Sequence, residues 1–464
     1  MFSAIANTFA NCFKIPELKS RILFTLLLLG ICRFAAMIPV PGLDTAELAR
    51  YIDEFQENAR QSGTSLLGLY SLFTGGALSR CAVASLGIMP YISATIILQL
   101  MTAVVPRLSK LSREEGGRTK IVQYGRYLTL LLCLGQGFLM ALAWENPDKI
   151  PGFQDFAGQL VMSDNIWWYR IETVLMLTTG TMLLMWLGEQ ITDRGIGNGI
   201  SLVITIGILA ELPTAGQALR LMFFPPEGVE DVKDPIYLVP MVALLLIVVS
   251  TVVAVTQAQR RIPVQYAQRA VGRKVYSGGS SFMPLRVNYA GVMPVIFAQA
   301  ILMLPEMVFQ FLAQQTGYGI FTDLASALRM GSIPYLVLYG LLILFMSYFW
   351  VSTQFNEIQI ADDLKKHGGY IPGVRPGQAT SDFLHRTMSR ITLAGAIFLT
   401  IVAVIPIILY DAMDIAMPVA QFFGGTSMLI IVGVTLDTMR QMESYLLMRH
   451  YDGFLKKGRI KGRF

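Results

Sequence analysis

An apolar stretch in the first quarter of the chain, residues 73–101, is broken by glycine and proline in a way that few folds tolerate. It carries Gly75, Gly76, Gly87 and Pro90 within a run that is hydrophobic enough to lie inside a membrane. Backbone groups freed by such breaks cannot face lipid, so the broken part must be buried in protein or line a cavity. After the proline the apolar residues return to helical spacing. The stretch predicts a short plug-like segment, a hinge, and then a helix that faces an interior, as in a channel or transporter.

The composition favours a membrane protein. Of 464 residues, 54% are hydrophobic and 15% are charged, whereas a soluble globular protein has about 25% charged residues. The four cysteines, Cys12, Cys32, Cys81 and Cys133, are widely spaced, and the three histidines lie in polar segments away from them. This distribution argues against a disulfide framework and against a metal site. We therefore expect a polytopic membrane protein without metal or cofactor.

Apolar runs of spanning length recur along the whole chain. The first, 22–40, is too long for the core of a signal peptide and is not followed by a small-residue cleavage site, so we expect it to be retained. With the helix near 81–105 there are ten expected spans, the others lying near 121–143, 166–188, 198–221, 236–257, 289–313, 333–355, 390–410 and 419–438. The sequence thus predicts an all-α polytopic protein with ten transmembrane helices.

The basic residues indicate the orientation of these spans. Most of the 37 lysines and arginines fall in the N-terminal segment, in the loops after even-numbered spans and in the tail, 439–464. Under the positive-inside rule these parts lie in the cytosol, and so do both termini. Within residues 1–20, apolar side chains at helical spacing favour an amphipathic helix on the membrane surface about as much as a frayed leader.

Two of the expected cytosolic loops are larger than simple connections. In the first, about 258–288, β-prone pieces on either side of residues 277–280 predict a hairpin that projects into solvent. In the second, about 356–389, the density of glycine and proline predicts a rigid, non-helical tip. Arg375 lies between two Pro-Gly pairs at this tip, which suits pairing with phosphate or carboxylate groups as well as it suits simple solvation.

Motifs for catalysis or nucleotide binding are weak. The glycine-rich residues 194–199 lack the Lys-Ser/Thr of a P-loop and follow a span, so we expect a tight turn between two helices. Ionisable residues within the spans are almost absent, and Arg33 and Arg80 lie near segment ends, from which a long side chain can reach the membrane surface. This pattern argues against two alternative classes, an ion-coupled secondary transporter and an intramembrane enzyme.

Two motifs carry a resemblance to a known family. Residues 87–101 read Gly-Ile-Met-Pro-Tyr-Ile-Ser-Ala-Thr-Ile-Ile-Leu-Gln-Leu-Met, and residues 188–201 read Gly-Glu-Gln-Ile-Thr-Asp-Arg-Gly-Ile-Gly-Asn-Gly-Ile-Ser. In this order they resemble the two signatures of the SecY family, the channel subunits of the bacterial protein translocase. The resemblance covers roughly residues 20–460. It departs after Asn356, where the family usually has Pro and then Glu and this chain has Glu357.

The resemblance implies two pseudo-symmetric halves of five helices around a central pore. The N-terminal half would comprise 21–221, with a plug at about 64–80, and the C-terminal half would comprise 222–438. It also implies a passive channel, not an enzyme, that moves unfolded secretory polypeptides across the bacterial inner membrane and releases membrane-protein helices sideways into lipid. SecA or the ribosome would drive it, and SecE, SecG and accessory Sec components would bind it.

The resemblance further implies four groups of functional residues. A ring of isoleucines would seal the pore by excluding water, although ordinary helix packing explains them from sequence alone. Its members would be Ile88, Ile92, Ile200, Ile204, Ile296 and Ile430. The plug would include Leu72, Phe73, Thr74, Gly75, Gly76 and Ala77, and the lateral gate Ser93, Gln99, Gln299 and Leu304. Contacts with SecA or ribosomal RNA would come from Arg260, Arg261, Arg269, Arg273, Lys274 and Arg375.

Overall fold

The computed structural model describes residues 15–44, 74–78, 80–114, 116–145, 160–163, 165–224, 235–266, 269–271, 274–276, 279–316, 318–328, 332–413 and 426–457. The chain forms two compact units, one of Met1–Leu219 together with Val434–Phe464 and one of Arg220–Gly433. The first unit thus includes a C-terminal segment that the expected halves assign elsewhere. The expected boundaries of those halves stay a prediction.

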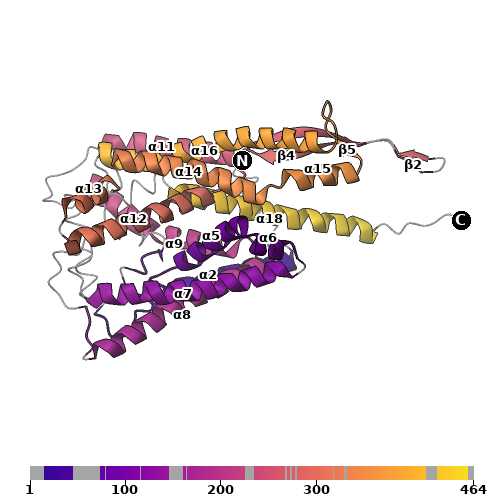
Figure 1. Ribbon diagram of the computed structural model, residues 1–464. Coiled ribbons are helices and arrows are strands. Elements are labelled where there is room, and N and C mark those ends of the chain that lie inside the picture. Colours follow the sequence, from indigo (N-terminus) through magenta and orange to yellow (C-terminus); the bar gives the residue numbers. More distant parts are fainter. Residues whose placement is uncertain are drawn as a thin grey trace. The chain divides into compact units, whose positions relative to one another are not determined.

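The first unit is built from helices, with α7 and α8 side by side (Figure 1). Its helices are α2 (Pro16–Ala35), α5 (Met89–Val104), α6 (Pro106–Arg113), α7 (Gly117–Glu145), α8 (Ile166–Arg194), α9 (Gly199–Ala210) and most of α10 (Leu212–Phe223). Pro16 and Pro90 lie in the first turns of their helices, where a missing N–H breaks no helical hydrogen bond. Asn198 caps α9 by accepting hydrogen bonds from two backbone N–H groups, so the predicted tight turn between α8 and α9 is confirmed.

The second unit combines helices with a small β element. Its elements are η2 (Pro235–Tyr237), α11 (Leu238–Gln257), β1 (Gln259–Tyr266), β2 (Arg269–Val271), β3 (Lys274–Tyr276), β4 (Ser280–Arg286), α12 (Met293–Thr316), α13 (Gly319–Ala327), α14 (Ile333–Gln354), α15 (Glu357–Lys366), β5 (Gly369–Tyr370) and α16 (Gln378–Met413). The last helix, α18 (Thr426–Lys457), starts in this unit and ends in the first.

Many of these helices have the length and apolar composition needed to cross a membrane. Among the described residues six qualify, or seven if Met89–Thr102 and Pro106–Ser112, which meet at a bend of 103°, form one broken span. A helix lies within each of the ten expected ranges, α9 and α10 sharing one. The protein is therefore an all-α polytopic membrane protein, while the count of ten crossings stays a prediction.

Helix α8 illustrates why these helices need a membrane. One face of it is buried in the first unit through Tyr169 and Leu177. The opposite face presents Trp168, Leu175 and Trp186, with 64%, 58% and 53% of their surfaces exposed. A long apolar stripe of this kind is unfavourable in water but is stabilised by lipid.

Glycines allow very close backbone contacts in the first unit. At Gly180 of α8, an added Cβ would lie 2.7 Å from the carbonyl carbon of Val83, so only glycine fits there without a backbone shift. At Gly135 of α7, by contrast, an added Cβ would meet no atom within 4 Å. The tight contact fixes α8 against the segment that precedes α5.

The β element confirms a hairpin but corrects its turn. β1 pairs antiparallel with β4, and β2 with β3. The strands that flank residues 277–280, β3 and β4, are not partners of each other, so the predicted turn position is wrong. Val271 pairs with Lys274, and the chain therefore reverses between them. Burial of Ile262 and Leu285 on one face of β1 and β4 sets the pairing, which outweighs the local glycine signal.

The second large loop is more helical than its glycines and prolines predicted. It contains α15, and α16 begins at Gln378, about three turns before the expected span at 390. Asn356 caps α15 by accepting a hydrogen bond from the backbone N–H of Gln359 at 3.1 Å. Between α15 and α16, residues 367–377 lie outside helices, so the predicted non-helical tip is confirmed in a shorter form.

Candidate functional site

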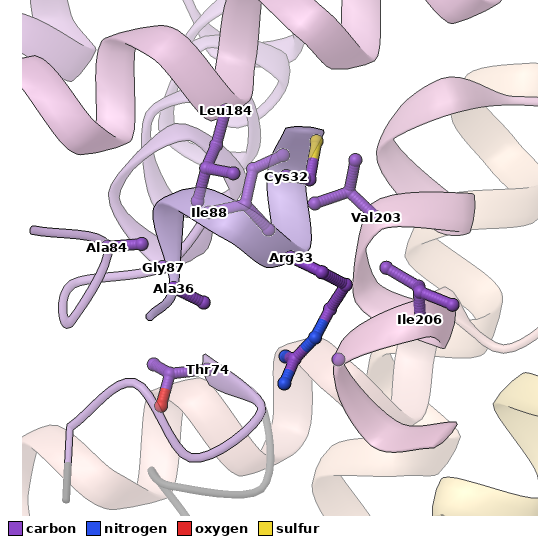
Figure 2. Close-up of a pocket in the computed structure, with 11 residues that line it drawn as sticks. Cys32, Arg33, Ala36, Thr74, Ala84, Gly87, Ile88, Leu184, Val203 and Ile206 are labelled. Atoms are coloured by element: carbon purple, nitrogen blue, oxygen red, sulfur yellow. The ribbon is translucent and has the colours of Figure 1, made fainter. Parts of the chain in front are cut away.

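A small cavity in the first unit joins the plug to the start of α5. Its volume is about 30 Å³, which leaves room for water. It is lined from α2, the plug, the segment just before α5, α8 and α9, with side chains that include Cys32, Arg33, Thr74, Ile88, Leu184 and Val203 (Figure 2). The walls are mostly apolar. Such a lining fits a seal better than a site for covalent chemistry.

The described part of the plug is compact and buried. Leu72 and Phe73 lie outside the described residues. Gly75 and Gly76 have φ angles of 64° and 77°, in the left-handed region that glycine adopts without strain. Ala77 is fully buried, and its carbonyl accepts a hydrogen bond from the hydroxyl of Ser85 at 3.0 Å. These contacts tie the plug to the chain segment that leads into α5.

Arg33 binds the plug from the last turn of α2. Its Nη1 donates a hydrogen bond to the carbonyl oxygen of Gly75 at 3.0 Å, and Figure 2 shows its side chain extending to the plug side of the cavity. Arg33 is half-buried and its guanidinium is held by this contact, while the prediction that its side chain can reach the membrane surface stays a prediction. Arg80, in contrast, is exposed.

A close backbone contact accompanies this hydrogen bond. An added Cβ at Gly75 would collide with the Arg33 guanidinium and would lie 2.9 Å from the Cα and the carbonyl oxygen of Gly207 in α9. Only a residue without a side chain can occupy this slot. The plug is thus held between α2 and α9.

The isoleucines of the predicted pore ring divide between the two units. Ile88, Ile92, Ile200 and Ile204 lie in the first unit, and Ile296 and Ile430 lie in the second. All are buried except Ile200, which is half-buried. Ile88 immediately precedes α5, and its carbonyl accepts the backbone N–H of Ile92 at 3.1 Å, so these two are one turn apart as expected. The ring itself stays a prediction.

The predicted lateral-gate residues lie on α5 and α12. Ser93 and Gln99 are half-buried on α5. Gln299 lies on α12, and its amide oxygen is buried without a hydrogen-bond partner. Leu304 also belongs to α12, but its side chain lies outside the described atoms. Because α5 and α12 belong to different units, a seam between them stays a prediction.

One acidic side chain that the sequence analysis did not single out is buried within an expected span. Glu306, on α12 within the expected span 289–313, is only 3% exposed. A single acidic residue does not interrupt an apolar run, so the local pattern did not mark it. Composition alone therefore does not exclude a secondary transporter.

The residues predicted to meet SecA or the ribosome lie in the β element and at the tip beside it. Arg260 and Arg261 on β1 are exposed, and so is Arg375. The carbonyl of Arg375 accepts a hydrogen bond from the Thr380 hydroxyl at 2.9 Å, which holds its backbone. Arg269 and Lys274 begin β2 and β3, with side chains outside the described atoms, and Arg273 lies outside the described residues.

The two large loops form one element, which the sequence did not predict. β5 of the second loop pairs with β1 of the first. Across this pairing the Tyr370 hydroxyl donates a hydrogen bond to the side-chain oxygen of Gln265 at 3.0 Å. Ile371 is buried in the cluster beneath the sheet. The pairing fixes the tip that carries Arg375 to the strand that carries Arg260.

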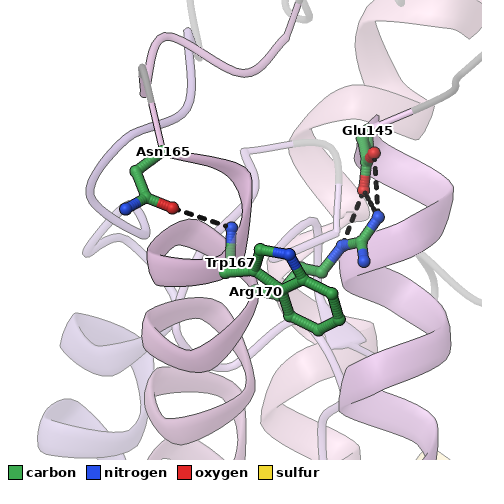
Figure 3. Close-up of polar contacts among 4 residues, drawn as sticks. All are labelled: Glu145, Asn165, Trp167 and Arg170. Carbon is green, nitrogen blue, oxygen red and sulfur yellow. Dashed lines mark hydrogen bonds and ion pairs between the residues drawn. The ribbon is translucent and has the colours of Figure 1, made fainter.

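An ion pair joins the C-terminal end of α7 to the start of α8 (Figure 3). Arg170 donates hydrogen bonds from Nε to Oε2 of Glu145 at 2.9 Å and from Nη2 to Oε1 at 3.0 Å, and its guanidinium lies 5.0 Å from the centre of the Trp167 ring. Asn165 caps α8 through the backbone N–H of Trp167. Bidentate geometry makes this a strong contact for a partly exposed pair.

No metal site emerges within the part of the chain that the structure describes. No group of three or more His, Cys, Asp or Glu side chains there could hold an ion. Cys32, Cys81 and Cys133 are buried free thiols, and Cys12 lies outside the described residues.

Comparison with known proteins places this arrangement in a family. The SecY family model matches residues 82–439. The chain is 42% identical to the protein translocase subunit SecY of Chlamydia trachomatis, over 98% of this chain and 99% of that protein. It is 41% identical to the subunit of the same name from Thermotoga maritima, with the same coverage, and to that of Escherichia coli over 96% of both chains.

Solved structures share the fold at much lower identity. One described as a protein-conducting channel matches with a TM-score of 0.57 and 17% identity over 92% of each chain. Another, whose description concerns the plug domain of SecY and the closed state of the translocation channel, matches with a TM-score of 0.54 and 17% identity. By its sequence relatives, and with a fold shared with these channels, the chain belongs to the SecY family, the protein-conducting channel subunits of the protein translocase.

Proposed function

We propose that the channel of this protein is closed at rest by the plug and moves unfolded secretory polypeptides across the bacterial inner membrane. The supporting observation is that residues 74–77 are held against α2 and α9, beside a cavity that Ile88 lines. The chain acts passively and is not an enzyme. Energy comes from SecA with ATP or from a translating ribosome.

The pore ring is the second part of the proposal. Ile88, Ile92, Ile200, Ile204, Ile296 and Ile430 line the narrowest point. Aliphatic side chains there exclude water and ions by dewetting, and they yield to a passing chain without specific chemistry. Five of the six side chains are buried, which supports this role and also fits ordinary helix packing.

The proposed partners bind at different surfaces. Exposed arginines of β1 and the tip near Arg375 bind SecA or ribosomal RNA, because guanidinium groups pair well with carboxylate and phosphate. SecE and SecG complete a heterotrimer, and accessory Sec components bind in addition. Both termini lie in the cytosol under the positive-inside rule.

Reconstitution tests the function directly. Proteoliposomes that contain this chain and SecE, supplied with SecA and ATP, should take up a secretory preprotein into a protease-protected space. Liposomes with SecE alone are the control. Uptake no greater than this control, with the chain correctly folded and SecA active, would refute the proposal.

We also propose that membrane-protein helices leave the pore sideways through a seam between α5 and α12. A disulfide across this seam tests the proposal. In a background with Cys12, Cys32, Cys81 and Cys133 replaced by Ser or Ala, Ser93→Cys and Leu304→Cys should crosslink when the seam is closed, since a disulfide needs Cα atoms within about 7 Å. Oxidation should stop both transport and helix insertion, and reduction should restore them. Ser93→Cys alone is the control. Quantitative crosslinking with unaltered transport would show that this seam is not the gate.

A further inference from the structure

We infer that Arg33 is a positioning residue that latches the plug through its backbone, and that the plug leaves its place only when this hydrogen bond breaks. The inference rests on the proposed function in one respect, because the plug closes the channel only if that function holds. The latch consists of Arg33 on α2, Gly75 in the plug and Gly207 on α9. All three belong to the first unit.

The geometry makes the contact specific for the plug backbone. Gly75 has a φ of 64° and so close an approach to Gly207 that a Cβ would lie 2.9 Å from its Cα. In this conformation the carbonyl of Gly75 accepts the hydrogen bond from Nη1 of Arg33 at 3.0 Å. A charged donor strengthens such a bond. Because the acceptor is a carbonyl, most side-chain changes in the plug leave the latch intact, whereas a side chain at Gly75 does not.

The charges around Arg33 allow the latch to open. Glu211, which follows the last residue of α9, attracts the Arg33 charge, and Arg80 repels it. Gly207 lies in the last turn of α9 and Glu211 caps the end of this helix, so the slot for the plug and the counter-charge lie at the same helix end. When the plug leaves, the negative charge of Glu211 still acts on the guanidinium. A buried cation without any partner would strongly oppose opening, and this arrangement avoids that cost.

Thiol labelling tests the latch without relying on transport. The channel, with its native cysteines replaced and Thr74→Cys as a single reporter, is purified with SecE and reconstituted. A membrane-impermeant maleimide then reports how often the buried position 74 becomes accessible. Arg33→Gln should raise the labelling rate about tenfold, the scale expected for loss of one hydrogen bond to a charged group. Lys19→Gln removes an equal charge from an exposed position on the same helix, α2, and should leave the rate unchanged.

A second variant protects the test against misfolding of the first. Gly75→Ala changes a residue outside the transmembrane helices and should raise labelling of the reporter thiol at position 74 as Arg33→Gln does, whereas Gly135→Ala should not. Equal labelling rates in the parent protein, Arg33→Gln and Gly75→Ala would overturn the latch.

Ion conductance separates the latch from the function of the plug. If labelling rises and the resting conductance across planar bilayers rises with it, the latch and the closure are both supported. If labelling rises while conductance stays at the parent level, the latch stands and the plug is not the seal. If labelling is unchanged in a channel that transports preprotein normally, the latch is wrong and the proposed function is untouched.

Discussion

The plug site and the cytosolic tip use glycine and arginine in opposite ways. At the plug, Gly75 is needed for space, because backbone and a guanidinium fill the volume that a side chain would take. At the tip, Gly373 and Gly377 have φ angles of 82° and 106° but no atom within 4 Å of an added Cβ. The plug needs glycine for contact, and the tip needs it only for the shape of the turn.

The arginines follow the same division. Arg33 is half-buried and bound to a carbonyl of its own chain, whereas Arg375 is exposed and its backbone, not its side chain, is held. An arginine bound inside the fold positions another segment. An arginine on a fixed backbone with a free path to solvent suits a partner. Burial and the identity of the bonded group thus distinguish an internal latch from a docking residue, although both are single arginines beside glycine.

The largest expected effect is on stability, from a side chain placed in an interior glycine contact. Gly180→Ala forces apart α8 and the backbone of Val83, and overpacking of this kind costs about 3 kcal/mol, the upper end of the usual range, because backbone cannot move aside as a side chain can. Thermal unfolding of the purified complex should show a lower midpoint. Gly135→Ala, in open space on α7, is the matched control, and equal midpoints would contradict a spatial role for Gly180.

Charge reversal at the tip should lower transport while leaving the fold intact. Arg375→Glu places a like charge against an acidic or phosphate partner, and we expect SecA-driven uptake at limiting SecA to fall about tenfold, which corresponds to about 1.4 kcal/mol. Arg386→Glu, an equal reversal at an exposed position on α16, should have little effect. Normal uptake by the first variant would remove Arg375 from the docking surface.

Polar residues in the pore ring should raise the ion conductance of the resting channel severalfold. Replacing Ile92 and Ile204 with serine puts hydroxyls at the constriction and keeps it wet, so the ion conductance of the resting channel should rise. Ile97→Ser, on the exposed side of α5, is the control and should not conduct. A resting conductance equal to that of the parent would assign these isoleucines to packing alone.

The smallest effect is expected from the ion pair of α7 and α8. Glu145→Gln removes the charge of a bidentate pair that is about one-fifth exposed on each side, and should lower the free energy of unfolding by about 1 kcal/mol. Lys366→Gln, which breaks the exposed pair with Asp363, should cause no measurable change. Thermal unfolding measures the stability of both variants. An equal change in the unfolding midpoint of the two would mean that the bidentate geometry of the Glu145 pair adds no stability.

Local signals were enough to predict most helices and the turn between α8 and α9. Pro90 and Asn198 act within one helical turn of themselves, so the sequence around them suffices. The hairpin turn was misplaced because Ser277 and its neighbouring glycines are a strong turn signal, while the real pairing depends on burial of Ile262 against residues distant in the chain. Side-chain burial across a sheet is not a local property.

The candidate site was predicted in part for the same reason. The family resemblance pointed to Gly75 and Ile88, but the contact between Arg33 and the plug joins residues 42 positions apart, and the sequence shows only a basic residue near a helix end. Glu306 was missed because one acidic residue does not change the hydrophobic pattern by which a long apolar run is identified as a span. Its burial depends on packing within the second unit.

The spacing between two exposed tryptophans of α8 can be compared with the thickness of the membrane around this protein. Trp168 and Trp186 are eighteen residues apart, which is five full turns, so they lie on the same face about 27 Å apart along the axis. Tryptophan rings prefer the two boundaries of a bilayer, whose hydrocarbon core is about 30 Å thick. Helix α8 therefore matches an upright crossing of an ordinary bilayer. A thinner membrane would force it to tilt, and the ends that meet α7 and α9 would move with it.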